Sequence, residues 1–392
     1  MPYDWLESSL KIIHKAGWHR TTRTITSAIG NCIEVEGKQY INFSSNDYLG
    51  LANDLRLKNA AIEAIQRHGT GTTGSRLVTG HRVLHEQLEQ SIADLKGTEA
   101  ALVFSSGYSA NIGTIAALVG KRDLILNDQY NHASLRSGSA LSGATCVDYQ
   151  HCNLQDLRQQ LETSRSRFVK CLILTDSIFS MDGDLAPLSE ILDLAVEFDA
   201  MVLVDEAHAT GVLGQRGSGG IEACNCTNRP VIQMGTLSKA IGSLGGYVTG
   251  SAILIDFLKN RAPSWIYTTA LSPADTAAAL AGIEIIRSEP DRRENLWCNI
   301  RFLKTQLNQT QFNQTQLNPI QLFPSDAAIV CIRQPTVQDA LKLSQHLQNS
   351  GIFAIAIRPP TVPTSRIRLT LTATHTPDQI EMLCGAIRSY LA

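Results

Sequence analysis

The spacing of hydrophobic positions changes along this chain, and each change predicts a different kind of structure. Residues 4–16 have the spacing of an amphipathic helix, and short strands are expected within residues 31–43. From about residue 55 to residue 286, short apolar runs alternate with longer helical stretches. That alternation is typical of a parallel sheet with crossover helices. The runs that predict strands are residues 100–104, 124–127, 171–174, 201–204, 231–234 and 246–249.

The pattern changes again after Pro290. A helix through Leu303 leads into residues 306–321, which are rich in Gln and Asn, and we expect a poorly packed surface connection there. Strands are expected at 327–332, 354–357 and 366–370, and helices at 337–348 and 377–390. The chain therefore predicts an α/β fold with a mostly parallel sheet in residues 46–286. An N-terminal helix with short strands (1–45) precedes it, and a smaller α+β domain (287–392) follows.

One lysine directly follows a predicted buried strand. Lys239 lies in the segment GTLSKAIG that begins at Gly235, just after the run 231–234. An amine is nucleophilic only when it is neutral, and an unperturbed lysine has a pKa of roughly 10.4. Burial lowers that pKa, so Lys239 is a candidate for a Schiff base with an aldehyde cofactor.

A second strand end carries an aspartate and a histidine. Asp205 ends the run 201–204, and His208 follows three residues later. Ligands of doubly wound sheets bind at the carboxyl ends of the strands. There, Asp205 can hold a pyridine nitrogen in its protonated form, and His208 can reach the phenolic oxygen of the same ring. The alternative makes Asp205 a helix N-cap and His208 a core residue.

A phosphate site is predicted where the run 100–104 turns into a helix over 109–119. The first turn of a helix presents unpaired backbone N–H groups to an anion. Gly107 lets the backbone come close, and Tyr108 follows it. His132, just past the run 124–127, offers a flat ring that can stack on a pyridine; a structural role at a helix start is the alternative.

Five motifs occur in the order of a known family: NFSSNDYLG from Asn42, SMDGD from Ser180, DEAH from Asp205, TLSK from Thr236 and RPPTVP from Arg358. Together they resemble the α-oxoamine synthases, fold-type I enzymes that use pyridoxal 5'-phosphate (PLP). The resemblance extends from the first helix to residues 366–373. It implies that Lys239 holds PLP and removes the α-proton of an amino acid.

The resemblance also implies further site residues. Ser180 lies near the phenolic side of the cofactor, and Thr236 donates to its phosphate. Thr268 and Thr269 resemble residues that reach the phosphate of the neighbouring subunit's cofactor. This implies a homodimer with shared active sites, in which Gly74 and the residues after it form a loop near the interface.

The substrate residues follow from the chemistry and from the resemblance. A bidentate arginine suits a carboxylate, and Arg358 is the candidate, with Asn46 as a second donor and Thr361 in the same motif as Arg358. Arg20 matches an arginine that holds the far carboxylate of a pimeloyl chain. Residues 357–363 resemble the branch that condenses L-alanine with a pimeloyl thioester, carried by CoA or by a carrier protein, in biotin biosynthesis. The nearer alternative joins glycine to acetyl-CoA or succinyl-CoA.

Composition excludes several classes of partner. The 392 residues carry a net charge of −2 and no long basic block, so no nucleic-acid partner is expected. No apolar run reaches the roughly 18 residues of a membrane span. The first residues lack a secretory signal, and an odd number of cysteines, nine, argues against complete pairing. We therefore expect a cytoplasmic protein.

Three motif matches suggest other chemistry. Residues 69–74 fit the pattern GxGxxG, the basis of a remote alternative, a nicotinamide-dependent oxidoreductase. The pattern requires a preceding strand, and the preceding residues predict a helix, so a loop is favoured. His81 and His85 have the spacing of two metal ligands on one helix face. A partly exposed helix that binds no metal is the favoured interpretation. Cys224 and Cys226 lack a second ligand pair, so no metal is expected.

Overall fold

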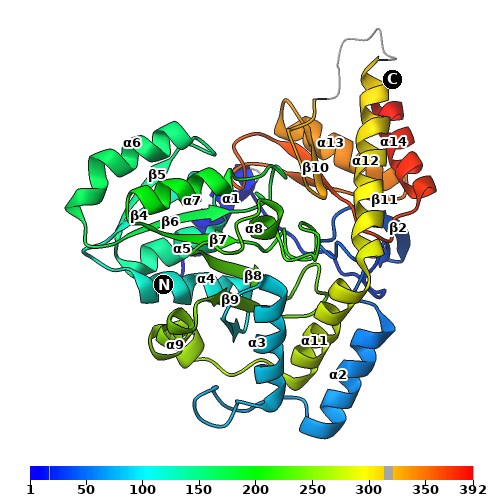
Figure 1. Cartoon of the computed structure of the whole chain (residues 1–392). Coiled ribbons are helices and arrows are strands. Elements are labelled where there is room, and N and C mark those ends of the chain that lie inside the picture. The colour runs from blue at the N-terminus through cyan, green and yellow to red at the C-terminus, as the bar shows by residue number, and fades with distance from the viewer. Residues whose placement is uncertain (17, 313–320, 392) are drawn as a thin grey trace.

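The computed structural model describes residues 1–16, 18–312 and 321–391. Its centre is a seven-stranded sheet (Figure 1). In spatial order the strands are β3 (Ala100–Phe104), β9 (Gly246–Gly250), β8 (Ile232–Thr236), β7 (Met201–Asp205), β6 (Cys171–Asp176), β4 (Leu124–Asp128) and β5 (Thr145–Tyr149). β9 runs antiparallel to β3 and β8, and the other neighbouring pairs are parallel. The expected mostly parallel sheet is therefore confirmed.

Helices cover both faces of this sheet, which explains why most of its strands are nearly continuous apolar runs. On one face, Leu172, Leu203 and Val248 belong to a buried cluster with side chains mostly from three helices. On the other, Ile173 and Val204 pack with side chains mostly from two more. The first three are α4 (Gly107–Leu118), α5 (Ala133–Ser142) and α9 (Ala252–Arg261), and the other two are α6 (Leu154–Ser164) and α7 (Leu188–Glu197).

A third group of helices packs beside β3 and β9 and connects the sheet to the C-terminal part of the chain. α11 packs against both α2 and α3, and all three contribute to the largest apolar cluster. The group comprises α2 (Leu55–His68), α3 (Val83–Lys96) and α11 (Pro273–Ser288). Short elements elsewhere are α1 (Trp5–Lys15), α8 (Gly220–Ala223), α10 (Pro263–Ile266) and a 3-10 helix at Arg165–Arg167.

Two three-stranded sheets complete the described fold. One has the order β10 (Ile329–Arg333), β13 (Arg366–Thr370), β12 (Ile355–Ile357). The other joins N-terminal β1 (Cys32–Val35) and β2 (Lys38–Asn42) to C-terminal β11 (Ile352–Phe353). Around them lie α12 (Pro290–Phe312), α13 (Val337–Asn349) and α14 (Pro377–Leu391). The pairing of β2 with β11 brings the NFSSNDYLG motif next to the C-terminal part of the chain. The domain boundaries after residues 45 and 286 stay predictions.

The sequence interpretation of residues 306–321 was wrong in its first part. α12 continues to Phe312, and Leu307 is fully buried one turn after Leu303. Gln and Asn on the other faces of a helix disturb it little, because leucines four residues apart keep an apolar stripe. Residues 313–320 lie outside the described residues. Among the helices that are described, none is long and apolar enough to cross a membrane.

Candidate active site

Three neighbouring strands end side by side and deliver the central residues of the site. Asp176 ends β6 and Asp205 ends β7, and the two residues pair across the strands. Thr236 ends the next strand, β8. Because parallel strands place their carboxyl ends at one edge, this edge is where a doubly wound sheet binds ligands.

Lys239 follows β8 and points toward this edge. Its Nζ lies 2.7 Å from Nε2 of His208. Burial lowers the pKa of Lys239 to about 8, although the charges of Asp205 and Asp176 act in the opposite direction. At that pKa roughly a tenth of the amine is neutral at pH 7, several hundred times more than for an unperturbed lysine.

Asp205 is a buried carboxylate whose hydrogen bonds come from neutral groups. Its side chain accepts from Asn111 Nδ2 at 2.8 Å and from the Ala207 backbone N–H at 2.9 Å. The residue is 3% exposed. A buried negative charge with neutral donors is stabilised further by a cation, so the position fits a protonated pyridine nitrogen.

His132 is the N-cap of α5 and lies within electrostatic range of the same groups. Its backbone N–H donates to Asp176 Oδ2 at 2.8 Å, and its Nδ1 lies 2.6 Å from Ser134 Oγ. Burial lowers the pKa of His132, with Asp205 opposing the shift and Lys239 adding to it. A neutral, flat ring held by its edge fits the stacking role.

Small residues bring the start of α4 against the end of β8. A Cβ atom added to Gly107 would lie 3.3 Å from Cβ of Thr236, and one added to Gly246 would lie 2.4 Å from the Gly107 nitrogen. α4 begins at Gly107, two residues earlier than predicted, because Ser106 caps it by accepting from Ser109 N–H. The backbone N–H groups of Gly107 and Tyr108 precede the first intrahelical bond of α4, so they fit a phosphate beside Thr236. Tyr108 next to them is half-exposed.

Arg368, which the motif analysis did not single out, connects the substrate motifs to this edge. Its Nε donates to the Ser180 carbonyl at 2.7 Å and its Nη2 to Asn46 Oδ1 at 3.2 Å. The alternation of β13 puts Arg366 and Arg368 on one face, and that pattern was the available signal. Asp176 ends its strand as Asp205 does and was detectable in the same way.

Two of the substrate candidates border a cavity of about 650 Å³. Arg20 and Arg358 both line it, together with Ser44 and Ser45 next to Asn46. Arg358 Nη2 donates to the His19 carbonyl at 3.3 Å. The exposed Thr361 donates its backbone N–H to the Arg358 carbonyl at 3.1 Å, so it closes a turn. Apolar side chains form much of the wall, among them Ile25, Ile29, Ile33, Leu341 and Phe353.

Thr268 and Thr269 lie next to the loop around Gly74. Ala270 N–H donates to the Gly74 carbonyl at 3.0 Å, and Thr72 Oγ1 donates to the Ala270 carbonyl. Thr269 is exposed and Thr268 half-buried. Both can therefore face a second subunit.

The three motif matches have structural explanations. Residues 69–74 form a loop after α2, so the strand that a nicotinamide fingerprint requires is missing there. His81 precedes α3, so the expectation that it shares a helix face with His85 was wrong. His85 is fully buried and bonds the Leu271 carbonyl, rather than lying on a partly exposed face. The thiols of Cys224 and Cys226 lie within hydrogen-bond distance of backbone carbonyl oxygens.

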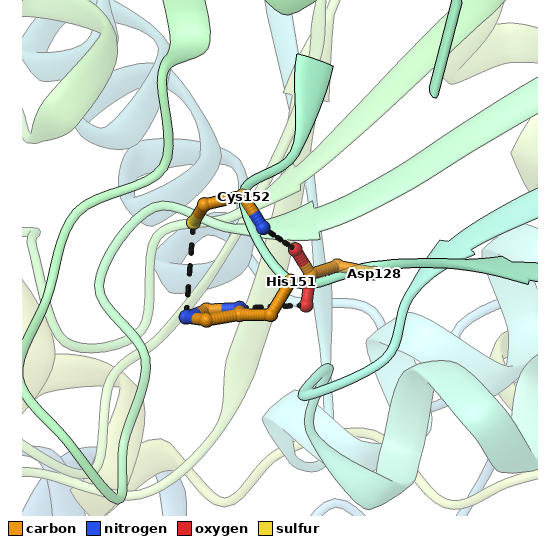
Figure 2. A group of neighbouring side chains, drawn as sticks. All are labelled: Asp128, His151 and Cys152. Atoms are coloured by element: carbon orange, nitrogen blue, oxygen red, sulfur yellow. Dashed lines mark hydrogen bonds and ion pairs between the residues drawn. The ribbon is translucent and has the colours of Figure 1, made fainter. Parts of the chain in front are cut away.

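Asp128, the last residue of β4, forms a cluster with His151 and Cys152 (Figure 2). His151 Nδ1 lies 2.9 Å from Asp128 Oδ1, and its Nε2 lies 2.6 Å from Asp184 Oδ2. Burial acts to lower the pKa of His151, but the bonds to both carboxylates raise it to about 12. We interpret the cluster as an ion-pair clamp that ties the SMDGD loop to β4, because both ring nitrogens already bond carboxylates.

The comparison with known proteins decides the family. A family model for aminotransferase class I and II matches residues 38–387. The chain belongs to this family. A putative 8-amino-7-oxononanoate synthase of Gloeothece citriformis is 59% identical over 387 residues, 99% of each chain. One of Rippkaea orientalis is 58% identical over 391 residues, the whole of both.

Solved structures of two enzymes have the same fold. A serine palmitoyltransferase of S. paucimobilis with a bound PLP–myriocin adduct matches with a TM-score of 0.90 and 30% identity, covering 99% of this chain and 97% of that one. An 8-amino-7-oxononanoate synthase of Francisella tularensis matches with a TM-score of 0.77 and 28% identity, over 90% and 97%. The expected fold-type I architecture and the resemblance to α-oxoamine synthases are confirmed.

Proposed function

We propose that the protein is an 8-amino-7-oxononanoate synthase, a PLP-dependent acyltransferase that condenses L-alanine with a pimeloyl thioester and releases carbon dioxide and the free thiol of the acyl carrier. Full-length relatives with that name support the reaction. The observation that carries it is the partly neutral Lys239 amine, 2.7 Å from His208 and within electrostatic range of the buried Asp205. Such a constellation at strand ends is typical of a catalytic site.

PLP, when bound, supplies an electron sink that stabilises negative charge on the α-carbon of the amino acid. Asp205, whose carboxylate is held by Asn111 and Ala207, would keep the ring nitrogen protonated. His132 would stack on the ring, and Ser180 and His208 would serve its phenolic side. Thr236, Gly107 and Tyr108 would hold the phosphate.

Lys239 is the base that takes the α-proton of alanine. Its amine must be neutral to accept a proton, and burial provides this at a pH near 8. The same group returns a proton to the product carbon after carbon dioxide has left.

Arginines recognise the two substrates. We assign the alanine carboxylate to Arg358, with Asn46 as a second group and Thr361 in the supporting turn. Arg368, already bonded to Asn46, is placed to assist. We assign the acyl chain to the cavity of about 650 Å³, whose wall is largely apolar, and its far carboxylate to Arg20. An apolar wall with cations suits a chain that ends in a carboxylate.

We propose a homodimer in which Thr268 and Thr269 reach the phosphate of the neighbouring subunit's cofactor. Exposed apolar side chains near them support an interface: Val78 is 78% exposed and Tyr267 is 85% exposed. Patches of this kind mark association surfaces. We place the enzyme in the cytoplasm, and the nine free cysteines agree with a reducing compartment.

A second candidate activity joins serine to a long acyl chain, because serine palmitoyltransferases match the fold with a TM-score of 0.90. Glycine with acetyl-CoA or succinyl-CoA is a third. The test incubates the PLP-loaded protein with each amino acid and each thioester separately and identifies products by mass. We expect 8-amino-7-oxononanoate from alanine and pimeloyl-CoA or a pimeloyl carrier protein. Faster condensation of serine with palmitoyl-CoA, or of glycine with a short acyl-CoA, would refute the assignment.

A further inference from the structure

Tyr48 is a buried residue of the NFSSNDYLG motif for which the proposed mechanism has no role. It is 1% exposed, and its hydroxyl lies 2.6 Å from Nδ1 of His208. The two rings meet edge to face with centroids 6.0 Å apart. His208 Nε2, on the opposite side of the imidazole, lies 2.7 Å from Lys239 Nζ. Tyr48, His208 and Lys239 therefore form one continuous chain of hydrogen bonds.

The protons in this chain can be assigned from the groups around it. Burial raises the pKa of Tyr48 to about 12, against the charge and hydrogen bond of Arg368, so the hydroxyl keeps its proton. Burial, and then the charges of Lys239 and Arg368, lower the pKa of His208 far below its usual value, so its ring carries one proton. The Tyr48 hydroxyl has two acceptors in reach, Nδ1 of His208 at 2.6 Å and Asn46 Oδ1 at 3.4 Å. Asn46 Oδ1 already accepts from Arg368 Nη2, and the contact with His208 is the shorter one, so the hydroxyl proton is assigned to the bond with Nδ1 of His208.

We propose that Tyr48 is a positioning residue that occupies Nδ1 of His208, holds the ring proton on Nε2 and so makes His208 a donor toward Lys239. An Nε2–H group donates to the lone pair of a neutral amine, and it conflicts with a protonated one. The same N–H group would donate to the phenolic oxygen of the bound cofactor. The inference rests on the proposed role of Lys239 as the base.

The charge state of Lys239 then depends on burial and on neighbouring charges, which are fixed, and on the tautomer of His208, which can change. Asp205 and Asp176 favour the protonated amine, whereas burial and Arg368 favour the neutral one. His208 favours the neutral amine when its ring proton is on Nε2, and it favours the protonated amine when that proton is on Nδ1. Without Tyr48, the ring proton can move to Nδ1, and a bare Nε2 then accepts from a charged ammonium group. Loss of the Tyr48 hydroxyl should therefore raise the pKa of Lys239.

The test compares Tyr48→Phe with Tyr247→Phe in the cofactor-free protein. Tyr247 is equally buried, and its hydroxyl bonds Thr210 Oγ1 at 2.8 Å, so the control removes a buried hydroxyl outside the Tyr48–His208–Lys239 chain. The pKa of Lys239 is read from the pH dependence of its acylation by acetic anhydride, quantified by peptide mass spectrometry against exposed Lys121. We expect Tyr48→Phe to raise the pKa by about one unit, which slows labelling at pH 7 about tenfold. We expect Tyr247→Phe to leave the labelling unchanged.

An unchanged Lys239 pKa in folded Tyr48→Phe protein, or an equal change in Tyr247→Phe, would overturn the inference. Nitrogen-15 spectra of His208 in the wild-type protein give a second readout that needs no variant. An Nε2–H tautomer supports the inference, and an Nδ1–H tautomer contradicts it. Neither measurement uses a substrate, so the inference can fail while product formation still succeeds, and the reverse also holds.

Discussion

The ion pair between Lys96 and Glu206 offers a sharp test of how the strand end that carries Asp205 is supported. Lys96 Nζ lies 3.0 Å from Glu206 Oε2, and both side chains are completely buried. Glu206 also accepts from the backbone N–H groups of Gly220 and Ile221 at 3.0 and 2.8 Å. Because Glu206 directly follows Asp205, this pair fixes the backbone on which the cofactor's carboxylate partner sits.

We predict that Lys96→Met destabilises the protein by about 3–5 kcal/mol, because a buried carboxylate loses its counter-charge. The unfolding entropy of 392 residues is about 0.8 kcal/mol per kelvin, so the melting temperature should fall by about 4–6 °C. Replacing both partners, as Lys96→Met with Glu206→Leu, should recover part of this loss, since no unpaired charge remains buried.

The control is an ion pair of similar geometry on the surface. Arg158 and Glu197 approach to 2.6 Å, but their side chains are 43% and 49% exposed. Arg158→Met should leave the melting temperature unchanged within error, since water screens exposed pairs. Differential scanning calorimetry compares the three variants with the wild type. The reasoning is refuted if Lys96→Met melts within 1 °C of the wild type, or if Arg158→Met loses as much as Lys96→Met.

Three further predictions concern the site and its assembly. Attachment of PLP to Lys239 in the cofactor-free protein should slow about tenfold per pH unit below about pH 8 and level off above it, since only the neutral amine reacts; a rate independent of pH between 6 and 8 would contradict this. Asp205→Asn should fold normally but lower α-deuterium exchange into alanine about 10²–10³-fold, as mass spectrometry would report, and exchange at the wild-type rate would remove Asp205 from the mechanism. Val78→Asp should convert the dimer to monomers in sedimentation experiments, whereas Val196→Asp on α7 should not; a monomeric wild type would end the dimer proposal.

Six of the seven strands of the central sheet were predictable, because burial on both faces leaves a simple signal; β5, which lies at the edge of the sheet and is largely exposed, was not predicted. The predicted run 100–104 matches β3 fully, and β7 extends the run 201–204 by one residue, Asp205. The C-terminal part of α12 was not predictable from composition. Gln and Asn there suggest a loop, and the deciding feature was the spacing of Leu303 and Leu307, both of them fully buried.

The site residues that lie at strand ends were predictable from the sequence. Those that reach the site through contacts between distant parts of the chain were not. Lys239 and Asp205 follow strands directly, so parallel topology alone brings them together. Asn111 lies within α4, and nothing local indicates that its amide meets Asp205. Tyr48 and His208 are 160 residues apart, so their contact exists only in the folded chain.

The central claim is that Lys239 carries the cofactor, and its most direct test is chemical. The PLP-loaded protein is reduced with borohydride, digested, and searched by mass spectrometry for the lysine that retains the cofactor. We expect a single labelled peptide containing Lys239, and loss of label in Lys239→Ala. Label on a different lysine, or equal labelling of Lys239→Ala, would contradict it.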